Sequence, residues 1–294
     1  MAQARIGRRE FLNQAALAGM GAAATAITLG SAGTAHAEQA SSAQLASEME
    51  QAKDQVADIF TAALIAEDLA TTFYYNGLIG KVIQDPNLAG PGGSATQVGG
   101  NGNAGNVNYL QAALSQEIDH ANLFRSLLGI AKPANDPVQT FYFPSGSFDT
   151  LAAFTGLLDA LENAFIGAYL NAIQEFTMKT LYRRVDQNSA DSVADGKTYS
   201  AEQMAYFAKV SGTILGVESE HRVLGRVISN TNPANNLAYE QTDGLTAVYN
   251  GPNSAVAALT PFLSASTGPG YSLATALANQ GKVSLPVTGN PPAF

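Results

Sequence analysis

Apolar side chains recur at helical spacing in four long stretches of this chain, separated by stretches rich in Gly, Asn, Pro and Ser. Such periodicity is typical of helices that bury one face. We predict helices over residues 41 to 80, 108 to 128, 148 to 182 and 200 to 228, the second of them ended by Gly129. Three starts show a capping-box pattern, in which Ser or Asn precedes Gln by three residues: Ser41 with Gln44, Asn108 with Gln111, and Ser200 with Gln203.

The segments between these predicted helices are of two kinds. Residues 89 to 108 are dominated by Gly and Asn, cannot bury a core, and predict a surface loop. Residues 130 to 147 contain three prolines and an aromatic stretch, so we expect neither a helix nor a compact turn there. At about 3.3 Å per residue this linker can extend roughly 55 Å, longer than the roughly 40 Å of a 27-residue helix. It can therefore cross the full length of a helical bundle.

Four long helices with one long crossover in the middle are typical of a ferritin-like bundle. We therefore predict an all-α protein in three parts: a signal peptide at residues 1–37, a ferritin-like four-helix bundle at 41–230, and a loop-rich C-terminal extension at 231–294 that packs on the bundle. Short helices are expected near 253 to 265 and 271 to 280. Because the crossover makes two helix pairs related by an approximate twofold axis, chemistry in the core should occur twice.

The N-terminus has the composition of an export signal. A basic start is followed by an Ala- and Gly-rich middle and an A-x-A end at Ala35 and Ala37. The adjacent Arg8 and Arg9 resemble the twin-arginine signal of bacteria, with an ordinary secretory signal as the alternative. We predict a periplasmic or secreted protein, exported through the twin-arginine pathway.

Charge and composition exclude several classes of function. The chain has a net charge of −9, and without residues 1–37 it has 12 basic and 23 acidic residues, a net charge of −11. This balance argues against nucleic acid and anionic membrane surfaces as partners. After the signal peptide no uninterrupted apolar run reaches about 18 residues, so we predict no transmembrane segment. Because the chain has no cysteine, any metal must be held by oxygen and imidazole nitrogen.

Two of the predicted helices carry a glutamate three residues before a histidine. The motif is EIDH in the second helix, with Glu117 and His120, and ESEH in the fourth, with Glu218 and His221. The only other histidine, His36, lies in the predicted signal peptide. With 11 glutamates in the 257 residues after position 37, chance would give both pairs with a probability of about 0.002.

A contact between neighbours on a helix surface is the alternative explanation for either pair. Apolar residues at helical offsets, Leu114 and Phe124 around the first pair and Ile214 and Leu224 around the second, instead place both pairs on the core-facing side. A carboxylate in that position is costly unless a cation compensates it.

The other two predicted helices each offer one glutamate in an apolar setting, Glu67 in the first and Glu162 in the third. Asp68, turned about 100° away from Glu67, is expected to face water. One glutamate from each of two helices and a Glu-x-x-His from each of the other two form the ligand set of dinuclear carboxylate-bridged centres. The predicted metal ligands are Glu67, Glu117, His120, Glu162, Glu218 and His221.

Charge balance indicates which cofactor this ligand set would take. Four buried glutamates carry a charge of about −4, which two divalent ions would neutralise while neutral imidazoles complete their coordination. Carboxylate oxygens with one nitrogen per metal favour iron or manganese, and zinc usually takes fewer ligands. A relic or metal-free bundle core is the alternative.

At this point the chain resembles the ferritin-like, rubrerythrin-type family that includes bacterial twin-arginine-exported members and plant desiccation-related proteins. The similarity extends over about residues 55 to 240 and rests on ALIAEDLATTFYYNGL, LSQEIDHANLFRSLLG, FYFPSGSFDTLAAFTGLLDALENAFIGAYLNAI and ILGVESEHRVLGRVIS. The resemblance implies a rubrerythrin-like bundle in which the same six residues are the metal ligands.

Four further residues are candidates for hydrogen bonds to the ligands: Gln116, Asp159, Tyr74 and Tyr169. In several oxygen-activating relatives an acidic residue precedes each Glu-x-x-His and supports the histidine of the opposite motif, whereas here Gln116 and Val217 take those positions. Glutamine can accept a histidine N–H, but valine cannot. Solvation is the alternative role for Asp159, and core packing is the alternative for the two tyrosines.

Three functions fit these residues. An exported oxidoreductase of the peroxidase, catalase or ferroxidase type would react with oxygen or peroxide at a di-iron or dimanganese centre. Iron oxidation and storage would need a hollow cage of subunits, which the long loop and the tail disfavour. A metal-pinned or metal-free structural protein that protects the cell envelope under stress is the third function. A second copy of the chain, forming a homodimer, is a further possible partner.

Overall fold

The computed structural model describes residues 54–85, 88, 105–185, 199–231, 234–235 and 255–284. The predicted signal peptide, the Ser41 cap, most of the Gly- and Asn-rich loop and most of the polar loop before the fourth long helix lie outside these residues.

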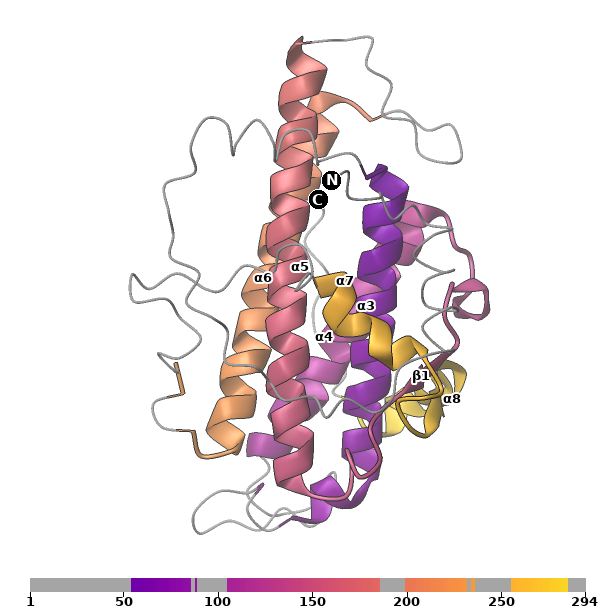
Figure 1. The fold of residues 1–294 in the computed structure, drawn as a ribbon, viewed down its shortest axis with the longest axis vertical. Coiled ribbons are helices and arrows are strands. Elements are labelled where there is room, and N and C mark those ends of the chain that lie inside the picture. The colour runs from indigo at the N-terminus through magenta and orange to yellow at the C-terminus, as the bar shows by residue number, and fades with distance from the viewer. Residues whose placement is uncertain are drawn as a thin grey trace.

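Four long helices form an all-α, ferritin-like bundle, as the sequence predicts (Figure 1). They are α3 (Val56–Ile79), α4 (Gly105–Leu128), α5 (Leu151–Val185) and α6 (Ala201–Ile228). The helix α3 packs along α4, and α5 packs along α6. The linker between α4 and α5 runs along the side of the bundle to the end where α5 begins, which confirms the long crossover (Figure 1).

The structure differs from the prediction at two helix starts. The helix α3 begins at Val56, because Gln55 has an extended backbone (φ −68°, ψ 149°), so the predicted helix is interrupted there; Ser41 itself lies outside the described residues. The helix α4 already includes Gly105, so Asn108 lies inside it and is not a cap. The Gln111 side-chain amide donates instead to the Val283 carbonyl at 2.7 Å, and thereby fastens the C-terminal segment to α4.

The third long helix is shifted by about one turn relative to the prediction. It begins at Leu151, because residues 145–149 form a turn in which Gly146 has φ 86°, and it continues to Val185. The fourth helix ends at Ile228 and starts with the predicted capping box of Ser200 and Gln203.

The crossover is extended for part of its length, and the C-terminal segment pairs with it. The crossover contains a 3-10 helix (Pro133–Asn135) and the strand β1 (Thr140–Tyr142). Strand β2 (Gly270–Ser272) pairs antiparallel with β1, with Phe141 opposite Tyr271. The remaining described elements are 3-10 helices at Lys81–Gln84, Thr260–Leu263 and Gln280–Lys282, and the short helices α7 (Ala255–Leu259) and α8 (Leu273–Asn279). The two short helices lie where the sequence predicts them.

The buried apolar residues form two clusters, one toward each end of the bundle. One is built around Phe73, Phe143 and Phe154, and the rings of Phe73 and Phe154 stack with centroids 4.6 Å apart. The other is built around Phe60 and Phe207, whose rings meet edge-on at 4.9 Å. On α4 and α6 the predicted metal ligands lie in sequence between the residues of the two clusters, so apolar side chains lie on both sides of the site along these helices.

One described helix is long and apolar enough to cross a membrane by length and composition alone. It is the Leu151–Thr180 part of α5, with a mean hydropathy of 1.2, and 61% of its most apolar window is buried inside the protein. The same helix carries Glu162, which is fully buried. Burial against α6 is typical of the core helix of a bundle, and the absence of a transmembrane segment stays a prediction.

Candidate metal centre

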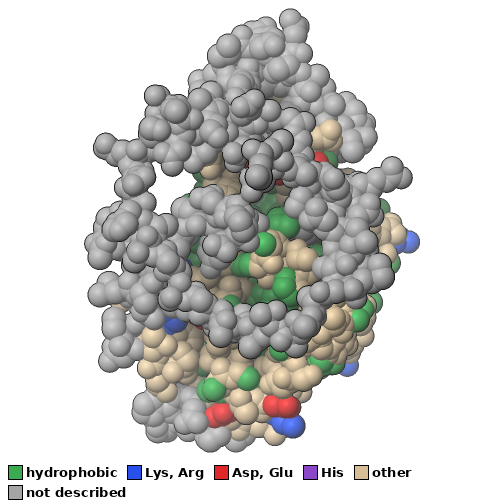
Figure 2. All heavy atoms as spheres, viewed as in Figure 1, with side chains coloured by type: hydrophobic (Ala, Val, Ile, Leu, Met, Phe, Trp, Pro, Cys, Tyr) green, Lys and Arg blue, Asp and Glu red, His purple; other side chains and the backbone are tan. Residues whose placement is uncertain are grey.

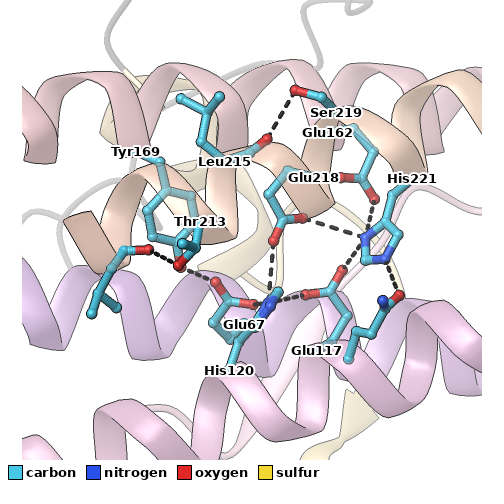
Figure 3. Close-up of polar contacts among 12 residues, drawn as sticks. Glu67, Glu117, His120, Glu162, Tyr169, Thr213, Leu215, Glu218, Ser219 and His221 are labelled. Atoms are coloured by element: carbon cyan, nitrogen blue, oxygen red, sulfur yellow. Dashed lines mark hydrogen bonds and ion pairs between the residues drawn. The ribbon is translucent and has the colours of Figure 1, made fainter. Parts of the chain in front are cut away.

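The structure brings all six predicted metal ligands together at the middle of the bundle (Figure 3). The helices α3 and α5 contribute one glutamate each, and α4 and α6 contribute one glutamate and one histidine each. All are buried except His120, which is half-buried. No described histidine is visible on the face of the molecule drawn in Figure 2.

The ligands form two overlapping groups that share two glutamates. One group is Glu67, Glu117, His120 and Glu218, and the other is Glu117, Glu162, Glu218 and His221. Within each group the ligand atoms lie within 4.8 Å of one another. The shared Glu117 and Glu218 therefore lie between the two groups, where a carboxylate can bridge two cations.

The oxygens of the shared glutamates are divided between the two histidines. His120 Nδ1 lies 3.5 Å from Oε2 of Glu117 and 3.2 Å from Oε1 of Glu218. His221 Nδ1 lies 3.0 Å from Oε1 of Glu117 and 3.5 Å from Oε2 of Glu218. The unshared carboxylates complete each group, with Glu67 3.2 Å from His120 Nδ1 and Glu162 3.9 Å from His221 Nδ1.

Buried polar atoms without hydrogen bonds converge on this cluster. Both carboxylate oxygens of Glu117 and of Glu218, Oε2 of Glu162 and Nδ1 of His221 have no hydrogen-bond partner. Buried polar groups normally have such partners, and an unsatisfied carboxylate is especially costly. Divalent cations would satisfy these atoms, and the oxygen-rich donor set with one imidazole per group suits iron or manganese. The residues present therefore fit a dinuclear centre.

Two tyrosines hold the unshared glutamates by reciprocal hydrogen bonds. The Tyr74 hydroxyl on α3 donates to Glu162 Oε1 on α5 at 2.6 Å, and the Tyr169 hydroxyl on α5 donates to Glu67 Oε1 on α3. Each tyrosine follows the glutamate of its own helix by seven residues. Both tyrosines thus bind ligands, rather than only pack in the core, and the repeated Glu-x6-Tyr spacing is a sequence signal for this arrangement.

Gln116 supports one of the two histidines. Its Oε1 lies 2.8 Å from Nε2 of His221, across the gap between α4 and α6. The glutamine before one Glu-x-x-His thus contacts the histidine of the other motif.

Burial and charge shift the pKa values of the ligands. Burial raises the pKa of Glu67 and of Glu162 well above the ordinary value. Burial alone would lower the pKa of both histidines, but the surrounding glutamates raise it well above the ordinary value. Burial alone would raise the pKa of Glu117, but the charge of His221 and the closeness of both histidines lower it. A site without metal therefore retains protons, which a cation would displace.

Asp68 does not face water, contrary to the prediction. It is 1% exposed and its Oδ1 accepts a hydrogen bond from Arg125 Nη2. The Nε of Arg125 donates to Asp136 Oδ2 at 2.8 Å, so the arginine links α3, α4 and the crossover. The prediction failed because Arg125 of α4 and Asp136 of the crossover lie against Asp68, so this side of α3 does not face water.

Asp159 does not bond to any ligand. Its Oδ1 accepts from Arg226 Nε at 2.7 Å and its Oδ2 accepts from Asn163 at 3.2 Å. Two of the buried arginines, Arg125 and Arg226, follow the histidine of their motif by five residues. The duplicated motif is therefore longer than the predicted one, namely Glu-x2-His-x4-Arg, and that spacing is the signal that the sequence analysis missed.

Comparison with known families matches the model of a ferritin-like domain to residues 55–187. This region contains α3, α4 and α5, and the match supports placing the chain in the ferritin-like superfamily. No curated protein and no solved structure matches the chain.

Proposed function

We propose that this chain is an exported ferritin-like protein with a dinuclear iron or manganese centre that reacts with oxygen or peroxide in oxidative or desiccation stress. One observation carries the proposal: two ligand groups share Glu117 and Glu218, and the buried oxygens of both glutamates accept no hydrogen bond. Buried carboxylates without hydrogen bonds need cations to neutralise their charge. Because Glu117 and Glu218 belong to both ligand groups, we expect two cations, one in each group.

The residues of the chain would have distinct roles in such a centre. Glu117 and Glu218 would bridge the ions, and Glu67 with His120 and Glu162 with His221 would bind one ion each. Tyr74 and Tyr169 hold the unshared carboxylates in place through their hydrogen bonds. When bound, the ions would supply the redox change that reaction with oxygen or peroxide requires. Apolar clusters lie toward both ends of the site, and the His120 side chain remains 13% exposed to solvent.

Elemental analysis of the exported, untagged protein, followed by a peroxide-consumption assay on the same sample, tests the proposal. We expect about two iron or manganese ions per chain and consumption of peroxide. The Glu117→Gln variant keeps the shape of the side chain but loses its charge, and should lose both the metal and the activity. Glu220 lies two residues from Glu218 on the exposed face of α6, so Glu220→Gln is the matched control and should retain both.

The results would also distinguish the alternative functions. Bound metal without peroxide consumption, together with a lower melting temperature after chelation, would favour a centre that only pins the bundle. Iron uptake far above two ions per chain by a large hollow assembly would favour storage. Absence of metal from the exported protein would contradict the dinuclear centre itself.

A further inference from the structure

The two histidines of the candidate centre have different surroundings, although their motifs repeat. The His221 side chain is 1% exposed, and its Nε2 is hydrogen-bonded to Gln116. The His120 side chain is 13% exposed, and no residue in the described part of the chain hydrogen-bonds to its Nε2. The two halves of the centre therefore differ in exposure and in support.

The hydrogen bond that Gln116 Oε1 accepts from His221 Nε2 has a direct consequence for a metal ligand. A partner on the far ring nitrogen fixes the tautomer and the ring orientation, and its loss typically lowers metal affinity by roughly 10- to 100-fold. With Gln116 on Nε2, the His221 ring presents Nδ1 to Glu117 Oε1 at 3.0 Å. Val217 takes the corresponding position before Glu218, and its apolar side chain can offer nothing to a ring nitrogen.

Burial, like this hydrogen bond, favours tighter binding of an ion in the half-site of His221 than in that of His120. Every ligand in the group of Glu117, Glu162, Glu218 and His221 is buried, so an ion there could leave only if helices separate. In the other group His120 meets solvent on one side, and water can replace it as a ligand without such an opening.

We infer that the two half-sites hold their ions unequally: the half with Glu162 and His221 binds first and tightly, and the half with Glu67 and His120 binds second and exchanges its ion with solvent. This inference rests on the proposed dinuclear centre. Gln116 is then a positioning residue, because it acts on the ion only through His221.

Titration of the metal-free full chain with Mn²⁺ tests the inference. Calorimetry should show two binding steps whose dissociation constants differ by at least about tenfold, and a chelator should remove one ion per chain fast and the other slowly. The His221→Ala variant should lose the tight step, and His120→Ala should lose the weak one. A crystal grown with one equivalent of Mn²⁺ should show anomalous scattering beside Glu162.

Three substitutions test the positioning role: one should weaken binding, one should restore it and one should strengthen it. Gln116→Leu should weaken the tight step by roughly 10- to 100-fold and leave the weak step unchanged, while Gln116→Glu, which keeps an acceptor, should restore it. Val217→Gln supplies the missing partner in the other half and should strengthen the weak step. A gain of affinity cannot result from partial unfolding. The Val217→Gln variant therefore tests the positioning role even if the Gln116→Leu variant folds poorly.

The possible results separate the inference from the proposed function. Two ions bound with equal affinity, or equal weakening of both steps by Gln116→Leu, would overturn the inequality and leave the dinuclear centre intact. Binding of the first ion beside Glu67 would also overturn it. If no Mn²⁺ binds under any condition, the dinuclear centre and the inference fail together.

Discussion

Buried charges in this core are compensated in two ways, and the difference separates structural residues from the candidate metal ligands. Asp68 and Asp159 each face a buried arginine that neutralises them. Glu117 and Glu218 face no arginine or lysine among the described residues, and only the two histidines lie near them. A pair of buried carboxylates that no arginine or lysine neutralises is available to bind metal cations.

Arg125 is predicted to be essential for folding and unnecessary for binding metal. Arg125→Met would leave Asp68 and Asp136 buried without their cation, so we expect the free energy of unfolding to fall by about 3–5 kcal/mol. Chemical denaturation measures the change. Lys81→Met is the control, because it breaks an ion pair with Asp149 whose side chains are 73% and 60% exposed and should cost less than about 1 kcal/mol. Equal losses for the two variants would contradict this account.

At the scale of single residues the sequence predicts which candidate ligands lie together better than it predicts the partners of the buried aspartates. Glu67 and His221 could be placed because a helix fixes the spacing of its own residues. The partners of Asp68 and Asp159 could not be placed, because each bond joins segments that only the fold brings together: Arg125 lies 57 residues from Asp68, and Arg226 lies 67 residues from Asp159. The Gln116 contact could be anticipated because the twofold repeat relates the two motifs.

The helices α4 and α6 end in the same way, which extends their repeat to whole elements. The N–H of Ile130 donates to the carbonyl of Arg125, and that of Thr231 to the carbonyl of Arg226, as in a Schellman motif. The residue before each donor has a left-handed backbone, Gly129 with φ 72° and Asn230 with φ 57°. Thus in each repeat the arginine five residues after the histidine has two roles. Its carbonyl accepts the hydrogen bond that ends the helix, and its guanidinium neutralises an aspartate.

The two caps are predicted to respond differently to substitution. Gly129→Ala should lower the free energy of unfolding by about 1–2 kcal/mol, because a side chain in the left-handed region clashes with the backbone. Asn230→Gly should not lower it, since glycine adopts that conformation at least as readily. Thermal and chemical denaturation of both variants test this, and destabilisation by Asn230→Gly would contradict it.

Helix ends were more predictable than helix starts, for a physical reason. Gly129 ends α4 through its own conformational freedom, a local property. The start of α4 depends on Leu88, whose carbonyl accepts from the Asn106 side chain, and the turn of α4 around Gln111 depends on Val283. Those partners lie elsewhere in the chain, and the capping pattern at Asn108 carried no information about them.

On the scale of the whole molecule, the C-terminal segment completes the core. Phe143 of the crossover is fully buried, and its ring lies 5.7 Å from that of Phe262 and 5.6 Å from that of Tyr271. The strand pairing of Phe141 with Tyr271 holds this contact in register. The sequence indicates an extended crossover and short C-terminal helices. It does not predict the pairing of β1 with β2, because these segments are 130 residues apart and neither carries a local pattern that depends on the other.

The molecule without metal is predicted to lose stability as the pH rises. The pKa values of Glu67, Glu162, His120 and His221 are raised in the folded protein. A group with a raised pKa stabilises the fold fully below its ordinary value, 4.5 for Glu and 6.5 for His, and loses that contribution as the pH rises through the raised value. Glu117 has a lowered pKa and opposes this trend only below about 4.5. The melting temperature in chelator should therefore fall as the pH rises above about 4.5, where the glutamates begin to lose their contribution, and further above about 6.5, where the histidines do.

Metal should reverse this dependence, because cations take the place of the protons. Binding to deprotonated ligands strengthens as the pH rises, so the increase in melting temperature on adding Mn²⁺ should be small near pH 5 and large near pH 8. Scanning calorimetry across this range, with and without Mn²⁺, measures both slopes. A double variant, Glu67→Gln with Glu162→Gln, removes two of the titrating groups and should flatten the slope of the metal-free protein. A melting temperature that rises with pH in chelator would show that the carboxylates are compensated without protons or metal, and would remove the electrostatic basis for a metal centre.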